Sequence, residues 1–238
     1  MNIAVIFAGG TGQRMNTKTT PKQFLKLHGK EIIIHTIDCF ENHPDIDKIV
    51  VVCLEAWIPR LQRMIKNNSI SKVASIVPGG STGQASIRNG IFEASRIASE
   101  DSIVLIHDGV RPLIDEETIS ACIESVRLYG SAITCVPATE TIVQERDGFI
   151  CSMIERQACR LARAPQCFYL KDIKLAHERA MSENRDDFID SAYLMAHYGH
   201  RLHVVEGKSE NIKITTPPDY YIFRAISDAK ESSQILGL

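Results

Sequence analysis

The sequence predicts an α/β protein with a Rossmann-like, mostly parallel sheet that helices cover on both faces. Strand-like and helix-like segments alternate along the chain as far as Val136. The strand-like runs are apolar at consecutive positions, which is typical of parallel strands buried on both faces. A third observation is a β-hairpin pattern at about residues 139–156, which interrupts the alternation and predicts an arm that projects from the sheet.

The predicted strands are short runs of Val, Ile, Leu and Ala that turn-forming residues separate. The run at 47–53, for example, contains Ile49-Val50-Val51-Val52 and follows the turn-rich Asn42-His43-Pro44-Asp45. Before the hairpin, strands are expected at 4–8, 47–53, 75–77, 102–106 and 132–136, and helices at 31–40, 57–66, 86–94 and 116–129. This order of strand, helix and strand is the one that parallel crossover units require.

The hairpin pattern consists of two strand-like runs, 141–144 and 149–154, on either side of Asp147-Gly148. Asp-Gly is a preferred two-residue hairpin turn because it tolerates positive φ at both positions. A hairpin that stands alone cannot bury its apolar side chains. It therefore folds back or packs on a second subunit, and we favour a homodimer arm. Beyond it, helices are expected at 171–183 and 190–198, a strand at 202–205, and a last helix after Pro217.

The composition indicates a soluble globular protein with a single domain, 1–238. Hydrophobic residues make up 44% and charged residues 24% of the chain, which are ordinary values. The net charge of −2 argues against a nucleic acid partner. The apolar runs are too short for a membrane span, and the N-terminus lacks a signal-peptide layout. The seven cysteines form no Cys-x-x-Cys pair, so no zinc site or disulfide framework is indicated and a cytoplasmic location is expected.

A glycine-rich turn, Gly9-Gly10-Thr11-Gly12, follows Phe7 and Ala8 at the end of the first predicted strand. Glycines let backbone N–H groups approach an anion closely, because no Cβ intervenes. Arg14 and Lys22 follow the turn and would place positive charge beside a bound polyphosphate. Taken alone, the turn leaves an alternative open, in which glycine only shapes the chain and the two cations are solvated.

Two familiar phosphate-binding loops do not fit this turn. A Walker A loop needs a glycine followed by Lys and then Ser or Thr, which the turn lacks. The dinucleotide fingerprint needs Gly or Ala where Met15 stands, and an acidic residue about 20 positions later at the end of the second strand. Here the second strand begins far too late. A nicotinamide-dependent oxidoreductase is therefore disfavoured.

Three turns that follow predicted strands carry polar or glycine-rich sequence. They are the first glycine turn, the turn at Gly79-Gly80-Ser81, and the segment from Asp108 to Arg111. Ligands of parallel α/β sheets gather at the carboxyl ends of the strands, so the three turns are expected to converge on one edge. Asp108 could simply cap its own turn, but its place after a central strand favours a functional role.

As a set, these motifs resemble those of the sugar-alcohol-phosphate cytidylyltransferases, in the same order and at similar spacing over nearly the whole chain. One branch of that family makes CDP-methylerythritol for isoprenoids, and another makes CDP-ribitol for teichoic acids or capsules. The resemblance rests on Ala8-Gly9-Gly10-x-Gly12-x-Arg14-Met15, Pro21-Lys22-Gln23-Phe24, Gly79-Gly80, Ser86, His107-Asp108-x-x-Arg111-Pro112, Pro165-Gln166 and Asn211-Ile212-Lys213-Ile214-Thr215.

The resemblance implies a reaction in which CTP and an alditol phosphate give a CDP-alditol and pyrophosphate. The acceptor's phosphate oxygen would attack the α-phosphorus in line while pyrophosphate leaves from the opposite side. Because a phosphate monoester is already anionic, no general base is needed, and catalysis reduces to positioning and charge stabilisation. Mg²⁺ would bridge the triphosphate oxygens.

The resemblance also implies roles for individual residues. Arg14, Lys22, Arg156 and Lys213 would be catalytic, the first two at the α-phosphate and pyrophosphate and the last two on the incoming phosphate. Nucleotide binding would fall to Phe7, Ala8, Gly9, Gly10, Thr11, Gly12, Gly79, Gly80, Ser81 and Ser86. Acceptor binding would fall to Asp108, Arg111, Thr141 and Asp190, with Asp108 also a metal ligand and Thr141 reaching the substrate of the neighbouring subunit.

The sequence alone leaves a structural role open for several of these residues. Arg156 fits a surface arginine after a hairpin, Lys213 fits a solvated strand lysine, and Ser86 fits a small helix residue. Of the departures from the family pattern, Ala164 and Ile189 stand where Thr is common. D-Ribitol 5-phosphate is the favoured acceptor, since the first turn is closer to that branch. The alternatives are 2-C-methyl-D-erythritol 4-phosphate and, from another class, a nucleotide-binding protein without transfer activity.

Overall fold

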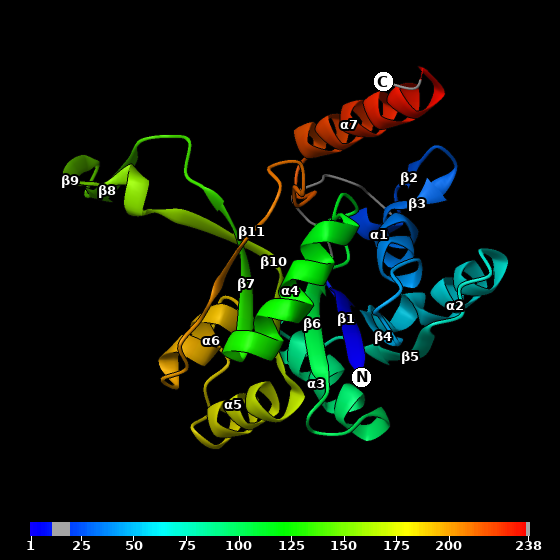
Figure 1. The fold of residues 1–238 in the computed structure, drawn as a ribbon, viewed down its shortest axis with the longest axis horizontal. Helices are drawn as coiled ribbons and strands as arrows, with labels where there is room; N and C mark the ends of the chain where they lie inside the picture. Colours follow the sequence, from blue (N-terminus) through cyan, green and yellow to red (C-terminus); the bar gives the residue numbers. More distant parts are fainter. Residues whose placement is uncertain (11–19, 237–238) are drawn as a thin grey trace.

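The computed structural model describes residues 1–10 and 20–236 of the chain. Its centre is a seven-stranded sheet in the order β11-β7-β10-β6-β1-β4-β5 (Figure 1). Neighbouring strands are parallel except at β10, which is antiparallel to both β6 and β7. The strands are β1 (Asn2–Ala8), β4 (Lys48–Cys53), β5 (Val73–Pro78), β6 (Ile103–Asp108), β7 (Ser131–Pro137), β10 (Arg160–Tyr169) and β11 (Val204–Glu206). The predicted mostly parallel sheet is confirmed.

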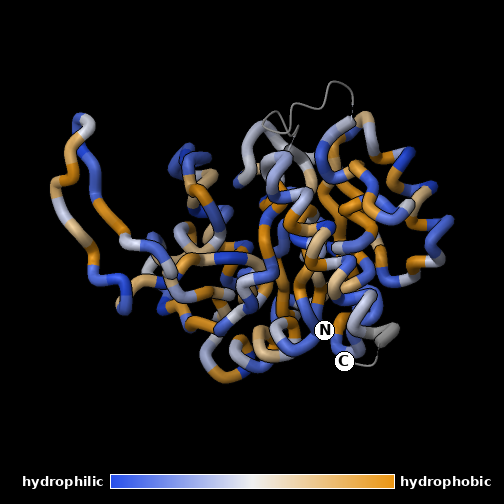
Figure 2. Tube along the Cα trace, turned by 90° about the horizontal axis from the view of Figure 1, so that it is seen from above, coloured by the Kyte–Doolittle hydropathy of each residue, from blue (hydrophilic) through white to orange (hydrophobic). Residues whose placement is uncertain are grey.

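Helices cover both faces of this sheet. Side chains of β1 alternate between the two layers: Ala4 and Ile6 belong to one apolar cluster, and Ile3 and Val5 to the other. The first cluster includes α1 (Ile32–Glu41), α2 (Ile58–Asn67) and α4 (Glu116–Tyr129). The second includes α3 (Gly83–Ile97), α5 (Leu170–Ser182) and α6 (Ser191–His197). Because both faces are buried, the strands can be apolar throughout, and apolar residues run through the centre of the molecule in Figure 2.

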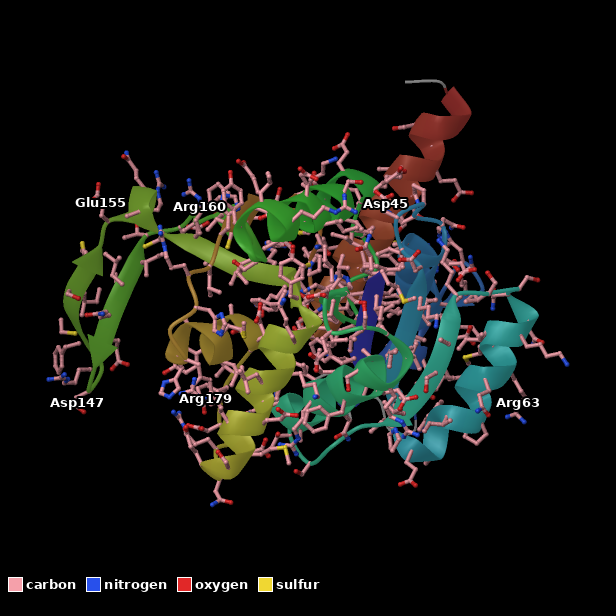
Figure 3. All side chains as sticks on the ribbon, turned by 60° about the horizontal axis from the view of Figure 1, so that its bottom comes forward. Asp45, Arg63, Asp147, Glu155, Arg160 and Arg179 are labelled. Carbon is pink, nitrogen blue, oxygen red and sulfur yellow. The ribbon has the colours of Figure 1, made fainter. Side chains whose placement is uncertain are left out.

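The predicted hairpin is present as β8 (Ile142–Arg146) and β9 (Phe149–Ile154), which form a separate two-stranded sheet. Asp147 and Gly148 in its turn have φ of 54° and 84°, as a two-residue turn with two left-handed positions requires. The hairpin projects from the body of the protein, and Figure 3 labels Asp147 at its far end. Phe149 is 78% and Met153 72% exposed, so the arm leaves large apolar side chains uncovered within one chain.

No pattern in the sequence predicts β10, although it lies between β6 and β7. Arg160 and Arg163 interrupt its apolar residues, and Pro165 cannot donate a ladder hydrogen bond. The structure accommodates the proline at an irregularity, where the register against β7 shifts between Ala162 and Gln166. This strand brings the residues around Pro165 beside the carboxyl end of β6.

The last helix, α7 (Pro217–Leu236), packs with a small sheet of β2 (Lys26–Leu27) and β3 (Lys30–Glu31). Their shared cluster includes Leu27, Ile214 and Phe223. The backbone N–H of Ile214 donates to Val110 O at 2.9 Å. The chain before α7 is thereby held over the carboxyl end of β6. In the described part of the chain, no helix combines the length and the apolar character needed to cross a bilayer.

Candidate functional site

The ends of β1, β5 and β6 meet at a cavity of about 590 Å³. Both glycine turns, Lys22, Asp108 and Lys213 contribute to its lining. A second cavity of about 320 Å³ adjoins it, and the two share Phe7, Gly83, Asp108 and Lys213. The structure thus brings together the three turns that follow strands, because parallel neighbours place their carboxyl ends at one edge.

The second glycine turn is held in shape by Ser86, the fourth residue of α3. Its hydroxyl accepts a hydrogen bond from Gly80 N at 3.0 Å and donates one to Thr82 O at 2.9 Å. A Cβ on Gly80 would lie 2.4 Å from Cβ of Ala85, so only glycine lets the turn approach the helix this closely. Ser86 lines the larger cavity, but its hydroxyl already serves a structural role there.

The first glycine turn is held by Gln23, a residue that the sequence did not mark as functional beyond its place in a motif. The side chain is 1% exposed, and its amide donates to Ala8 O at 2.7 Å and to Gly10 O at 3.1 Å. The neighbouring Phe24 stacks on Trp57 with ring centroids 4.4 Å apart. The short 3₁₀ helix Lys22–Phe24 therefore fixes the turn through the Gln23 side chain. It also places Lys22 in the lining of the larger cavity.

Lys22 connects this anchor to the segment before α7. Its ammonium donates to Ile214 O at 2.9 Å. The next two residues, Thr215 and Thr216, donate from their backbone N–H groups and hydroxyls to one oxygen of Asp219, at 2.7 to 2.9 Å. Thr215 also lines the larger cavity. The site is thus built from segments that are nearly the whole chain apart in sequence.

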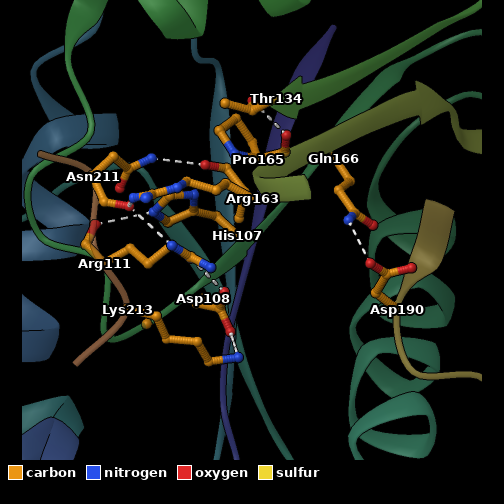
Figure 4. Close-up of polar contacts among 12 residues, drawn as sticks. His107, Asp108, Arg111, Thr134, Arg163, Pro165, Gln166, Asp190, Asn211 and Lys213 are labelled. Atoms are coloured by element: carbon orange, nitrogen blue, oxygen red, sulfur yellow. Dashed lines mark hydrogen bonds and ion pairs between the residues drawn. The ribbon is translucent and has the colours of Figure 1, made fainter. Parts of the chain in front are cut away.

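Asp108 lies in the wall between the two cavities. Its Oδ2 is 2.8 Å from Nε of Arg111, and its Oδ1 is 2.5 Å from Nζ of Lys213 (Figure 4). Burial raises the pKa of Asp108, but the charges and hydrogen bonds of Lys213 and Arg111 outweigh burial and hold the pKa below its usual range. Asp108 is therefore ionised, and it holds both cations at the boundary between the cavities.

A third cation, Arg163 of β10, lines the smaller cavity. Arg111 and Arg163 each donate from Nη1 to the carbonyl oxygen of Asn211 at 2.9 Å. The Asn211 amide in turn donates to Ala164 O at 2.8 Å. Figure 4 shows these side chains gathered at the end of β6. The sequence did not identify Arg163 because it lies on the strand that no pattern predicted.

Asp190 also lines the smaller cavity. Its Oδ1 accepts from Tyr193 N at 2.7 Å and so caps α6, and its Oδ2 accepts from Nε2 of Gln166 at 3.0 Å. Gln166 also accepts from Ala192 N at 2.8 Å. The carboxylate is therefore fixed in position by neutral donors and makes no ion pair with a described residue.

Not all of the predicted site residues line these cavities. Arg156 and Thr141 line neither cavity, because both belong to the arm. Arg156 donates to Thr139 O at 2.9 Å and lines a separate hollow at the base of the arm. Gly79 packs behind the larger cavity, where a Cβ would lie 3.3 Å from Cα of Gly9. Three further predicted residues lie outside the described part of the chain: Thr11, Gly12 and Arg14.

The described residues suit two neighbouring anions better than proton transfer or a protein-held metal. No three His, Cys, Asp or Glu residues in the described ranges are grouped as metal ligands. His107 lines neither cavity. Its ring is buried with Nε2 3.1 Å from Arg111 O, and burial lowers the pKa of His107 to about 4. The larger cavity offers glycine backbone and Lys22, and the smaller one offers three cations. Such a site can hold two phosphate groups side by side.

The family model described as 2-C-methyl-D-erythritol 4-phosphate cytidylyltransferase (IspD) matches residues 2–228. A ribitol-5-phosphate cytidylyltransferase of Streptococcus agalactiae serotype V is 51% identical over 239 residues, covering all of both chains. One of Vibrio parahaemolyticus is 48% identical over the whole of both chains. A 2-C-methyl-D-erythritol 4-phosphate cytidylyltransferase of Syntrophotalea carbinolica is 38% identical, covering 96% of this chain and 97% of that protein.

The fold is also similar to solved structures. The 2-C-methyl-D-erythritol 4-phosphate cytidylyltransferase of Francisella tularensis superposes with a TM-score of 0.74 at 28% identity, covering 94% of this chain and 99% of the other. The 4-diphosphocytidyl-2C-methyl-D-erythritol synthase of Anaerococcus prevotii has a TM-score of 0.80 at 24% identity, covering 95% and 96%. The second likeness shows the fold alone.

Proposed function

The chain belongs to the IspD family of cytidylyltransferases, and from this premise we propose that it converts CTP and D-ribitol 5-phosphate to CDP-ribitol and pyrophosphate. The observation that carries the choice of acceptor is the full-length 51% identity to ribitol-5-phosphate cytidylyltransferases. Identity to the methylerythritol-phosphate enzyme of Syntrophotalea carbinolica is lower, 38%. The two adjoining polar cavities give the proposed reaction a place for each substrate.

In this proposal the larger cavity binds CTP. The backbone of Ala8, Gly9 and Gly10 would hold the triphosphate, together with Thr11 and Gly12. The second turn, at Gly80 and Ser81, would hold the nucleoside, since it forms the other wall of the same cavity. Gly79 and Ser86 would contribute indirectly, by fixing the shape of that turn. Phe7 lines both cavities and would lie between CTP and the acceptor. Base selection by backbone groups requires such rigid turns.

The smaller cavity would bind the acceptor, with its phosphate against the cations and its hydroxyls near Asp108 and Asp190. A phosphate oxygen of the acceptor forms the new bond to the α-phosphorus of CTP, and the bond to the β-phosphate oxygen breaks. Pyrophosphate leaves with the electron pair of that bond. Lys213 lines both cavities and Lys22 lines the larger one, so positive charge lies along the reaction path. Arg14 would add to it. Fixed charge that is already in place stabilises the transition state without reorganisation.

Mg²⁺ is proposed to arrive on the triphosphate rather than in a protein cage. Magnesium sites of this kind use one or two carboxylates together with substrate phosphates and water. Asp108 is the carboxylate that faces the larger cavity, and it would be the protein ligand, although Lys213 and Arg111 occupy its oxygens here. When bound, the ion would supply further positive charge at the phosphates.

The test is pyrophosphate release from CTP and Mg²⁺ with D-ribitol 5-phosphate or 2-C-methyl-D-erythritol 4-phosphate as acceptor. We expect release with both substrates present, a kcat/KM at least about tenfold higher for the ribitol ester, and no release after EDTA treatment. The reverse preference would assign the alternative acceptor of the same family. CTP binding without release from either acceptor would identify a nucleotide-binding protein instead.

The arm is proposed to complete the site of a second copy of the chain. Its apolar side chains are uncovered in the single chain, with Phe149, Ile150 and Met153 each more than half exposed. Arg156 and Thr141 lie on the arm and line neither cavity of their own chain. A homodimer would cover the apolar surface and would bring both residues to the acceptor bound by the partner subunit.

Subunit complementation tests this arrangement. Arg156→Ala and Lys213→Met homodimers are each expected to be nearly inactive. When the two chains are co-expressed, mixed dimers contain one site with an intact Lys213 and an intact arm arginine, so about a quarter of the wild-type activity should return. If Arg156 acted within its own chain, every site of a mixed dimer would carry one defect and no activity would return.

A cytoplasmic location is part of the proposal. Its support is chemical: all seven cysteines are free thiols, as expected in a reducing compartment. The proposed product, a CDP-alditol, would then be available to enzymes that transfer alditol phosphate to cell-surface polymers.

A further inference from the structure

The smaller cavity contains more positive charge than its carboxylates balance. Three cations line it, Arg111, Arg163 and Lys213, together with the carboxylates Asp108 and Asp190. Asp108 pairs with both Arg111 and Lys213, whereas Asp190 accepts only from neutral donors. Among the described residues, no carboxylate lies within ion-pair distance of Arg163. Arg163 therefore makes no ion pair with a described residue, although the Glu210 carboxylate acts on it at longer range.

Arg163 is also incompletely hydrogen-bonded. Its Nη1 donates to Ser209 O at 3.0 Å and to Asn211 O at 2.9 Å, while Nε and Nη2 donate to no described residue. Arg111 donates to the same Asn211 carbonyl, so the two guanidinium groups lie close together. Burial and the nearby charge of Arg111 lower the pKa of Arg163, and the Glu210 carboxylate opposes this only in part. An anion between the two groups would relieve this repulsion and accept the remaining N–H bonds.

We infer that Arg163 is a ligand of the acceptor's phosphate, contributed from the same chain as Lys213. This inference rests on the proposed function, because it assigns the acceptor to the smaller cavity. A phosphate monoester carries a charge of about −1.5 to −2 near neutral pH and has three strong acceptor oxygens. The planar guanidinium can donate two parallel hydrogen bonds to two of these oxygens. The charge of the phosphate would balance the excess of three cations over two carboxylates in the smaller cavity. Arg163 thereby selects a phosphorylated acceptor over a free polyol.

A purely structural role would give a different result. Arg163 ties β10 to residues 209–211, which precede Lys213. If this tie were its whole role, its loss would displace Lys213, which lines both cavities, and would weaken CTP and the acceptor together. A phosphate ligand affects the acceptor alone.

The experiment compares Arg163→Gln and Arg163→Lys with the wild-type enzyme. A matched control is Arg127→Gln on α4, where an exposed arginine pairs only with Glu124 at 3.8 Å. For each protein we would measure KM for CTP, KM for D-ribitol 5-phosphate, and inhibition by inorganic phosphate competing with the acceptor. Arg163→Gln should raise the acceptor KM and the phosphate inhibition constant about 10- to 100-fold. The CTP KM should not change, Arg163→Lys should fall between, and Arg127→Gln should match the wild type.

An unchanged acceptor KM in Arg163→Gln would overturn the inference, as would an equal rise in both KM values. Glutamine can still donate to the Asn211 and Ser209 carbonyls, so the fold should be kept, which a thermal melt verifies. Wild-type enzyme that releases no pyrophosphate with either acceptor would instead defeat the proposed function, and this inference with it. The two failures are therefore distinguishable in one set of assays.

Discussion

Replacing Lys22 with methionine is expected to lower kcat by about 10²- to 10³-fold, the usual effect of losing one preorganised charge donor at a developing negative charge. Lys22 lines the larger cavity and its ammonium is held 2.9 Å from Ile214 O. Its position is set by the buried Gln23 and Phe24 that follow it. The charge is therefore already in place when the α-phosphate is attacked, and methionine keeps the stem but removes the charge.

The measurement is single-turnover pyrophosphate release at saturating CTP and acceptor, with thermal unfolding in parallel. The free energy of unfolding should change by less than ~1 kcal/mol, since Lys22 is only partly buried. Lys26→Met is the matched control, because Lys26 lies four residues further on, is exposed, and pairs only with Glu31 at 3.5 Å. Near-normal turnover in Lys22→Met would contradict a role for this residue in the chemistry.

Lys213→Met should be the more damaging change and should lower kcat/KM for the acceptor by roughly 10³-fold. Lys213 lines both cavities, and its ammonium lies 2.5 Å from the buried Asp108 carboxylate. The substitution removes charge at the boundary where the two phosphates react. It also leaves Asp108 with Arg111 as its remaining cation, so the free energy of unfolding should fall by about 1–3 kcal/mol.

A double variant separates these two consequences. Asp108→Asn combined with Lys213→Met removes the carboxylate that has lost one of its two cations, so it should recover part of the lost unfolding free energy but none of the lost activity. Lys213→Arg keeps the charge and should retain part of the activity. If the double variant regained turnover together with stability, Lys213 would be a structural partner of Asp108 rather than a group that acts on substrate.

The strand β10 shows where sequence reasoning fails. Most of the strands that were predicted are buried on both faces by helices, so their apolar runs were visible. β10 instead carries Arg160, Arg163 and Pro165 and pairs through an irregular register. Its place in the sheet is decided by the partners β6 and β7, which lie far from it in sequence. Arg163 was missed for this reason, and with it the charge balance of the smaller cavity.

Gln23, Ser86 and Asn211 illustrate the same limit within the site. Each is part of a motif, but its structural role depends on the backbone groups with which it forms hydrogen bonds. Gln23 donates to the Ala8 and Gly10 carbonyls, Ser86 accepts from Gly80 N, and Asn211 donates to the Ala164 carbonyl. Spacing along the chain does not specify such contacts. A buried polar residue inside a glycine-rich motif is the signal that could have marked Gln23 beforehand.

The sequence by itself determined the mostly parallel sheet, the hairpin at Asp147-Gly148 and the convergence of three turns on one edge, because apolar periodicity and turn chemistry are local properties. Only the tertiary structure decided that Asp108 pairs with both Arg111 and Lys213 and that Arg163 lines the same cavity. It also decided that Arg156 and Thr141 lie away from the two cavities of their own chain. These features depend on which distant segments meet, and that follows from packing over the whole chain.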